Sequence, residues 1–138
     1  MSVKIKAAKF EDLKSILKIH KESLRIYSWS YNKRYIERAI RYGNFYVIKK
    51  DNKVIGAIKI CVYPTTILIT NIAIDKKHRR KGYGEKLIQF AIKKAKGKKV
   101  VLETLTKSRV SKFYEKMGFR LVDSGIWRKT KWLKYQRI

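Results

Sequence analysis

The chain has 138 residues, of which 45% are hydrophobic and 33% are charged. That apolar share excludes an intrinsically disordered chain and supports one hydrophobic core, so we expect a single domain over residues 1–138. Lysine and arginine total 36 against 10 acidic residues, which gives a net charge of +26. Such a charge attracts nucleic acids and acidic proteins, although a lysine-rich proteome would produce the same composition.

Cys61 is the only cysteine, so no disulfide can form within the chain. It lies in an apolar run, which is typical of a buried small residue, and no Cys/His spacing suits a metal ion. No segment approaches the length of a membrane-spanning helix, and the N-terminus is too charged for a signal peptide. We therefore expect a cytoplasmic protein with no bound metal and no membrane association.

The first half of the chain predicts a strand, two helices and a hairpin. The strand is Val3–Ala7, where apolar and basic residues alternate. Apolar residues and His20 share one helical face over Glu11–Tyr27, and His20 is interpreted as a core or edge residue there. A second helix carries Tyr35, Ile36, Ala39 and Ile40. The pair Asp51-Asn52 predicts a turn between the strands Phe45–Lys49 and Val54–Val62.

The second half alternates between strands and helices. We expect strands at Ile67–Ile74, Val100–Leu105 and Phe119–Val122, a final basic strand at Ile126–Tyr135, and helices from the turn near Gly82 to Lys96 and over Ser108–Met117. Gly97 suits the end of the first of these helices because it has no Cβ. The predicted order is βααβββαβαββ.

The most informative segment is the basic glycine turn Arg79-Arg80-Lys81-Gly82-Tyr83-Gly84, between a strand and a helix. Glycines let a backbone approach a ligand closely, and a helix start offers free N–H groups and a positive dipole end, which suits phosphate. The string lacks the Lys-Ser/Thr of a P-loop, and Leu87 replaces the third glycine of a dinucleotide fingerprint. An ordinary turn is the alternative reading of this segment.

A second motif, Phe113-Tyr114-Glu115-Lys116-Met117-Gly118-Phe119, follows in the chain. In this order the two motifs resemble those of the GCN5-related N-acetyltransferase (GNAT) family. The resemblance implies an α/β (α+β) fold, with a mixed, mostly antiparallel sheet of about seven strands flanked by four helices. Glu103 and the segment Asn71–Asp75 resemble the ribosomal-protein alanine acetyltransferase branch of that family.

The resemblance also implies a site for acetyl-coenzyme A (acetyl-CoA) as cosubstrate. The pantetheine arm would pair with the backbone of Ile72, Ala73 and Ile74. The pyrophosphate would meet the turn through Arg79, Arg80, Lys81, Gly82, Tyr83, Gly84 and Glu85. Arg79 matches the leading position of the motif, whereas the Arg80 and Lys81 side chains could equally be solvated. His78 would contact phosphate or solvent.

Tyr114 matches the tyrosine that the family places beside the coenzyme sulfur, as a general acid for the departing thiolate. A buried aromatic residue is the alternative. Glu103 is the candidate general base, or else the ion-pair partner of a lysine. The branch has Asn seven residues before the tyrosine, where this chain has Lys107. Lys107 could contact the coenzyme phosphates instead, which leaves specificity for a protein N-terminus open.

Two functions follow from these residues. The first is acetyl-CoA-dependent N-acetylation of a primary amine on a protein N-terminus, a lysine, a small molecule or an RNA. Tyr27, Trp29, Tyr31 and Tyr35 would border its acceptor site or pack the helix junction. The alternative is a nucleic-acid-binding protein on the same scaffold, which uses the basic clusters Lys76–Lys81, Lys93–Lys99 and Arg128–Lys134 with Trp127 and Trp132. A monomer and a homodimer are both compatible with the sequence.

Overall fold

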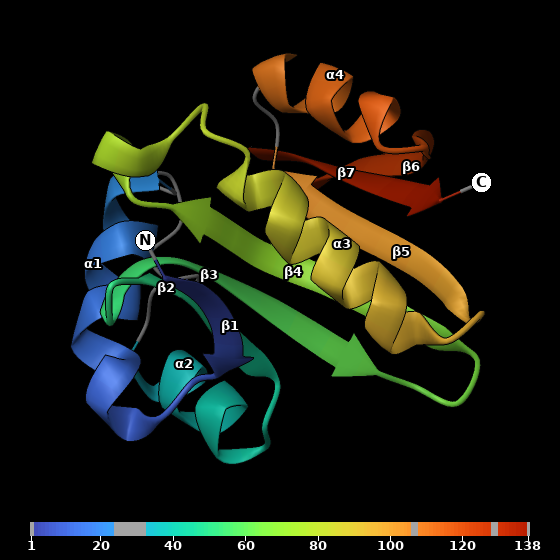
Figure 1. Cartoon of the computed structure of the whole chain (residues 1–138). Helices are drawn as coiled ribbons and strands as arrows, with labels where there is room; N and C mark the ends of the chain where they lie inside the picture. The colour runs from blue at the N-terminus through green and yellow to red at the C-terminus, as the bar shows by residue number, and fades with distance from the viewer. Residues whose placement is uncertain (1, 24–32, 106–107, 128–129, 138) are drawn as a thin grey trace.

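The computed structural model describes residues 2–23, 33–105, 108–127 and 130–137. Its first half contains β1 (Val3–Ala7), α1 (Leu13–Ser23), α2 (Lys33–Arg41), β2 (Phe45–Lys50), β3 (Lys53–Val62) and β4 (Thr66–Ile74). Its second half contains α3 (Tyr83–Ala95), β5 (Lys99–Leu105), α4 (Ser108–Lys116), β6 (Phe119–Trp127) and β7 (Thr130–Arg137). Single 3₁₀ turns precede α1 at Phe10–Asp12 and follow β4 at Lys76–His78. The predicted order of helices and strands is confirmed (Figure 1).

The strands form one seven-stranded sheet in the order β1-β2-β3-β4-β5-β7-β6. The β4–β5 pair is parallel, and the other neighbouring pairs are antiparallel. A parallel pair needs a crossover connection, which α3 provides between β4 and β5. The mixed, mostly antiparallel sheet that the sequence predicts is therefore confirmed.

Helices cover both faces of the sheet because the strands alternate their apolar side chains. On one face, Leu87 and Ile88 of α3 pack with Ile58, Ile67 and Ile69 of the sheet. The opposite face is covered by α1 and α2, which bury their own apolar residues against β2 and β3; this second core contains Ile16, Ile36, Ala39, Ile40, Phe45, Val47 and Ala57. Figure 1 shows α3 lying across β4 and β5, whereas α1 packs against β3 and β4, and α2 packs against β2. We name these surfaces the α3 face and the α1/α2 face.

The C-terminal hairpin differs from the prediction. The strand expected over Phe119–Val122 continues to Trp127, and the final strand begins at Thr130 rather than Ile126. Trp127 pairs with Thr130 across the hairpin end, so Ile126 belongs to β6. Residues 126–135 are mostly basic and aromatic and include no Gly, Pro or Asn, so the local pattern did not separate the two strands.

The start of α1 also differs, because a 3₁₀ turn at Phe10–Asp12 precedes the helix. The Lys9 backbone N–H donates to Asp12 Oδ2 at 2.9 Å, and Lys49 Nζ lies 3.2 Å from Asp12 Oδ1. This buried carboxylate therefore fixes the entry of the chain into α1. The predicted helix end at Tyr27 lies outside the described residues. In the part of the chain that is described, none of the helices is long and apolar enough to cross a bilayer.

Candidate active site

The parallel strands β4 and β5 separate halfway along their length. Their pairing runs from Thr66 with Lys99 to Ile69 with Leu102. In the described strands no pairing continues beyond this point, although β4 extends to Ile74 and β5 to Leu105. The part of β4 from Thr70 to Ile74 is thus not paired with β5 and resembles an exposed strand edge, apart from the Asn71 and Ile74 carbonyl oxygens, which contact His20 Nε2 and Arg79 Nε. This segment includes Ile72, Ala73 and Ile74, which the sequence predicts to meet pantetheine.

A bulge in β4 coincides with this separation. Ala57 of β3 is opposite Ala73, whereas Lys59 is opposite Thr70, so Asn71 and Ile72 together face Ile58. Asn71 has a φ of 53°, in the left-handed region that asparagine tolerates better than most residues. A bulge bends its strand and increases the local twist, which gives a physical reason for β4 to leave β5 here.

His20 of α1 contacts the backbone of this bulge. Its ring is fully buried, with Nε2 2.6 Å from the Asn71 carbonyl oxygen and Nδ1 3.1 Å from the Ile16 carbonyl oxygen. Burial lowers the pKa of His20 below 6.5, although both carbonyl contacts act to raise it. We assign the proton of the neutral ring to Nε2, which then donates to Asn71, because Ile16 is already the helical partner of the His20 N–H.

The Asn71 side chain is held from the α1/α2 face. The Tyr35 hydroxyl of α2 donates to Asn71 Oδ1 at 3.2 Å, and Lys59 Nζ donates to the Tyr35 hydroxyl at 2.9 Å. The Lys59 ammonium also lies 4.4 Å from the centre of the Tyr35 ring. We name Lys59, Tyr35 and Asn71 the polar row; it connects β3, α2 and the bulge.

The basic glycine turn follows β4 directly. Arg79 Nε donates to the Ile74 carbonyl at 3.1 Å, so this side chain ties the turn to the end of the strand. His78 Nδ1 lies 2.8 Å from Asp75 Oδ2 and forms an ion pair when protonated. The prediction that His78 contacts phosphate or solvent did not foresee this carboxylate partner. These two contacts shape the loop that leads to α3.

The N-terminus of α3 leaves its backbone open to close approach by a ligand. Gly82 precedes the helix with a φ of +84°, which favours glycine. The N–H groups of Tyr83, Gly84 and Glu85 belong to the first turn, where a helix provides no acceptor. A Cβ at Gly84 would meet Phe113 only at 3.6 Å and Ile74 at 4.0 Å. The protein's own packing therefore does not demand glycine at position 84, whereas a ligand against the backbone would.

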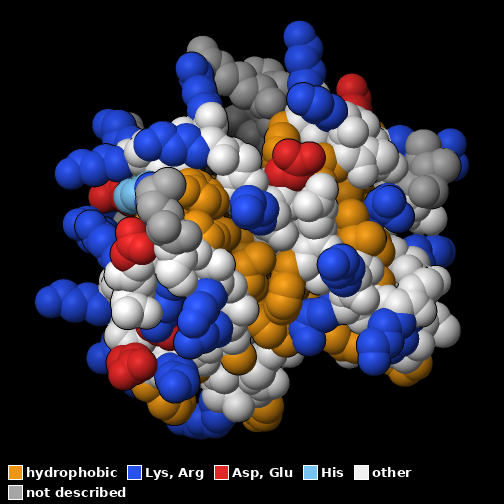
Figure 2. All heavy atoms as spheres, in the orientation of Figure 1, with side chains coloured by type: hydrophobic (Ala, Val, Ile, Leu, Met, Phe, Trp, Pro, Cys, Tyr) orange, Lys and Arg blue, Asp and Glu red, His pale blue; other side chains and the backbone are white. Residues whose placement is uncertain are grey.

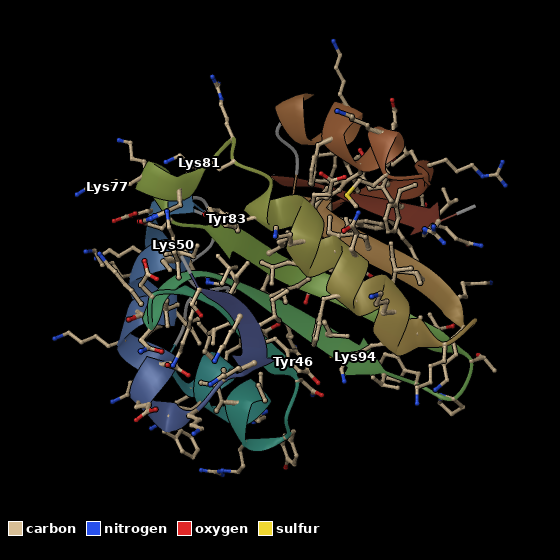
Figure 3. The ribbon with its side chains drawn as sticks, viewed as in Figure 1. Tyr46, Lys50, Lys77, Lys81, Tyr83 and Lys94 are labelled. Carbon is tan, nitrogen blue, oxygen red and sulfur yellow. The ribbon has the colours of Figure 1, made fainter. Side chains whose placement is uncertain are left out.

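The side chains of the turn take different positions. Lys81, Arg80 and Glu85 are exposed, whereas Tyr83 is 8% exposed and belongs to the core beneath α3. Figure 3 shows Lys77 and Lys81 on the loop and Tyr83 where α3 begins. Tyr83 can consequently offer a ligand its backbone N–H but not its side chain. Exposed lysines add a positive charge that is screened by salt.

Tyr114 is buried on the α3 face, at 2% exposure. Its ring centre lies 5.4 Å from that of Tyr135 and 5.5 Å from that of Phe113. Burial raises the pKa of the Tyr114 phenol well above its usual value near 10, a hydrogen bond with Thr104 opposes this, and Tyr135 adds to it. Thr104 lies on β5 beyond the last pair with β4. The phenol is therefore a protonated donor next to the separated part of the sheet.

Glu103 lies on the opposite face of β5 from Thr104, because side chains alternate along a strand. Its side chain is exposed, and its cross-strand neighbour on β7 is Lys134. Within the described chain, no lysine or arginine lies within ion-pair distance of Glu103. The structure thus gives no support to the ion-pair alternative, and it places Glu103 on the same sheet face as the polar row.

Four other residues that the sequence predicts near the site lie outside the described residues: Tyr27, Trp29, Tyr31 and Lys107. Among the residues that are described, no group of three His, Cys, Asp or Glu side chains could hold a metal ion. The sequence predicts His20 as a core or edge residue and Tyr35 as a residue of the acceptor site or the helix junction, but it did not single out Lys59. Each of these contacts joins residues 24 to 51 positions apart, which local patterns do not reveal.

Comparisons with known proteins agree with this architecture. The family model described as the Acetyltransferase (GNAT) domain matches residues 41–121. Ard1 from Thermoplasma volcanium has a similar structure, with a TM-score of 0.87, 24% identity and coverage of 99% of this chain and 97% of that chain. The PaiA N-acetyltransferase from Thermoplasma acidophilum, in complex with coenzyme A, has a TM-score of 0.81, 22% identity and coverage of 97% and 98%.

The ribosomal-protein-S18-alanine N-acetyltransferase from Escherichia coli also shares the fold, with a TM-score of 0.82, 16% identity and coverage of 99% of this chain and 93% of that chain. No curated protein sequence matches the chain. The structural likenesses establish the fold, and the family model, which covers more than half of the chain, establishes the family.

Proposed function

Because this chain belongs to the acetyltransferase (GNAT) domain family, we propose that it transfers an acetyl group from acetyl-CoA to a primary amine, with residues 1–138 as the catalytic domain. The observation that carries the proposal is the continuity of two backbone features. The edge of β4 that is not paired with β5 ends at Ile74, and the N-terminus of α3 lies beside that end, since a Cβ at Gly84 would be 4.0 Å from the Ile74 side chain. An extended arm with a pyrophosphate at one end matches this sequence of sites.

Recognition of the coenzyme would depend mainly on the backbone. The β4 edge at Ile72, Ala73 and Ile74 would pair with the amides of the pantetheine arm, as an added strand does. The pyrophosphate would accept hydrogen bonds from the first N–H groups of α3, where the helix dipole favours negative charge. Such contacts persist at high salt, whereas the attraction of the exposed Arg80 and Lys81 does not.

The chemical step would form a C–N bond and break the C–S bond of the thioester. The amine lone pair attacks the acetyl carbonyl carbon, and the sulfur leaves with the electron pair of the C–S bond. Tyr114 would give its phenolic proton to this thiolate, and its raised pKa keeps that proton in place at neutral pH. The proton that Tyr114 gives is then restored from solvent.

Glu103 would accept the proton that the amine loses. Its exposure and its lack of a cationic partner in the described chain leave the carboxylate free for this role. Tyr114 and Glu103 lie on opposite faces of β5, so donor and acceptor of protons would act from opposite faces of the sheet. Water could relay the proton between the amine and this carboxylate.

Thiol release from acetyl-CoA, measured against a panel of peptide and small-molecule amines, tests the proposed function. We expect amine-dependent release by the wild-type protein and a large loss in Gly84→Trp, because the indole would fill the space above the α3 N-terminus. Gln89→Trp places the same side chain on an exposed position of α3 and should retain activity. Equal activity in both variants, or no release with any amine, would contradict the proposal.

The charge distribution supports a second candidate, nucleic-acid binding. Figure 2 shows one face on which Lys and Arg side chains surround a hydrophobic strip and outnumber Asp and Glu. Two aromatic rings on the α3 face, Tyr46 and Phe90, are however already contacted by Lys94, which lies 5.0 Å from the Tyr46 ring and 5.7 Å from the Phe90 ring; Figure 3 shows Lys94 and Tyr46. Trp132 packs tightly against Gly125, where a Cβ would come within 2.5 Å of the indole. Binding of this kind would therefore depend on phosphate contacts and weaken steeply with salt.

A further inference from the structure

The polar row belongs to the face of the sheet from which, under the proposed function, an amine would approach the thioester. The coenzyme features, namely the α3 N-terminus and Tyr114, belong to the α3 face of the sheet. Asn71, Tyr35, Lys59 and Glu103 belong to the α1/α2 face. A nucleophile must approach a planar thioester from above or below its plane, and a coenzyme held from the α3 face leaves the α1/α2 face for this approach.

Lys59 is a half-buried cation with fewer polar contacts in the described chain than its ammonium group can make. Its described contacts are the hydroxyl and the ring of Tyr35, at 2.9 Å and 4.4 Å. An ammonium group carries three N–H donors, so two of them have no acceptor in the described chain. No carboxylate of that chain lies within ion-pair distance of Lys59. A cation in this situation gains most from an anion that arrives with a ligand.

We propose that Lys59, oriented by Tyr35, selects acceptor amines that carry a carboxylate close to the amine, as a peptide with an acidic first residue does. The inference rests on the proposed function and adds the substrate class. Two hydrogen bonds connect Lys59 Nζ through the Tyr35 hydroxyl to the Asn71 side chain on the bulge, so a carboxylate bound to Lys59 would lie near the part of β4 that the coenzyme is proposed to use. The hydroxyl and the ring of Tyr35 contact the ammonium at that position.

The same charge would disfavour acceptors with lysine or arginine at this position, in agreement with a chain whose net charge is +26. A single half-buried lysine would thus discriminate between acidic and basic acceptors by charge.

The test compares peptides that differ only in the first residue: Asp or Glu against the uncharged isosteres Asn or Gln, and against Lys. We expect the wild-type kcat/KM to favour the acidic peptide over its amide isostere by about tenfold or more, which corresponds to about 1.4 kcal/mol. Lys59→Met should bring the two peptides within about threefold of each other, mainly through KM. Lys59→Glu should invert the preference towards the lysine peptide, and Lys59→Arg should retain the wild-type order.

Lys53→Met is the matched control, because Lys53 is an exposed lysine at the start of the same strand, β3. Coenzyme binding by calorimetry shows whether each variant is folded and separates the two proposals. Coenzyme binding with no acetylation of acidic peptides, with no acidic preference, or with a preference that survives in Lys59→Met, would overturn this inference alone. Absence of coenzyme binding to the wild-type protein would overturn the proposed function and the inference with it.

Discussion

Replacing His20 with Gln gives a pH-dependent test of how the bulge is held. The folded protein binds a proton on His20 less readily than the unfolded chain does, because burial lowers its folded pKa below 6.5. Below pH 6.5 the unfolded state therefore binds more protons than the folded state, and the free energy of unfolding falls as the pH falls. The slope from this residue approaches about 1.4 kcal/mol per pH unit until the folded pKa is reached.

Urea denaturation between pH 7.5 and pH 5 measures this slope at pH values above those at which most carboxylates titrate. Glutamine cannot titrate but can still donate to the Asn71 carbonyl, so His20→Gln should flatten the pH dependence. At pH 7.5 the variant should lose about 1–3 kcal/mol if the carbonyl is left without a donor, and less if glutamine reaches it. His78→Gln removes the other histidine of the chain and serves as the control.

A slope in His20→Gln equal to that of the wild-type protein would refute the reasoning, because it would show that His20 does not titrate differently in the two states. A slope of the opposite sign in the wild-type protein would show that the two carbonyl contacts at 2.6 Å and 3.1 Å keep the imidazolium charged in the fold. Either outcome would remove the assignment of a neutral ring that donates to the bulge.

Four further outcomes are expected. Tyr114→Phe should lower kcat by about 10²–10⁴-fold with an unchanged dissociation constant for acetyl-CoA, and a turnover within threefold of wild type would remove the acid role. Glu103→Gln should lower turnover more for amines that are protonated at the assay pH than for weakly basic amines, and an equal effect on both would remove the base role. Gly56→Ala should destabilise the protein by about 1–3 kcal/mol in thermal or urea unfolding, because its Cβ would come within 2.7 Å of Ile74 and 2.9 Å of Ile48. Gly84→Ala should leave stability nearly unchanged but weaken coenzyme binding, and the reverse pattern in these two glycines would contradict their assignment.

The sequence predicts the order of the elements because each one carries a local signal. Alternation marks β1, apolar runs mark β3 and β4, Gly82 and Gly97 delimit α3, and Gly118 ends α4. The glycine turn and the Tyr114 motif also identify the family that the family model then shows. The local pattern fails to predict where β6 ends and β7 begins, because residues 126–135 contain no glycine or proline.

The polar row and the His20 contact could not be predicted from local patterns, because they depend on long-range register. Lys59 is one lysine in a strand of a lysine-rich chain, and only its position next to the bulge gives it Tyr35 as a partner. His20 looks like any polar residue at the edge of an apolar helical face until the fold brings it to the Asn71 carbonyl. A one-residue bulge decides both contacts.

Calorimetric titration of acetyl-CoA at about 1 M salt, where the Debye length is about 3 Å, tests the central claim most directly. We expect a one-to-one association in the wild-type protein and in Gln89→Trp, and its loss in Gly84→Trp, because backbone amides at the α3 N-terminus hold the pyrophosphate. An association that disappears at this salt concentration, or that is the same in Gly84→Trp, would show only a polycation that attracts a polyanion and would contradict the acetyltransferase proposal.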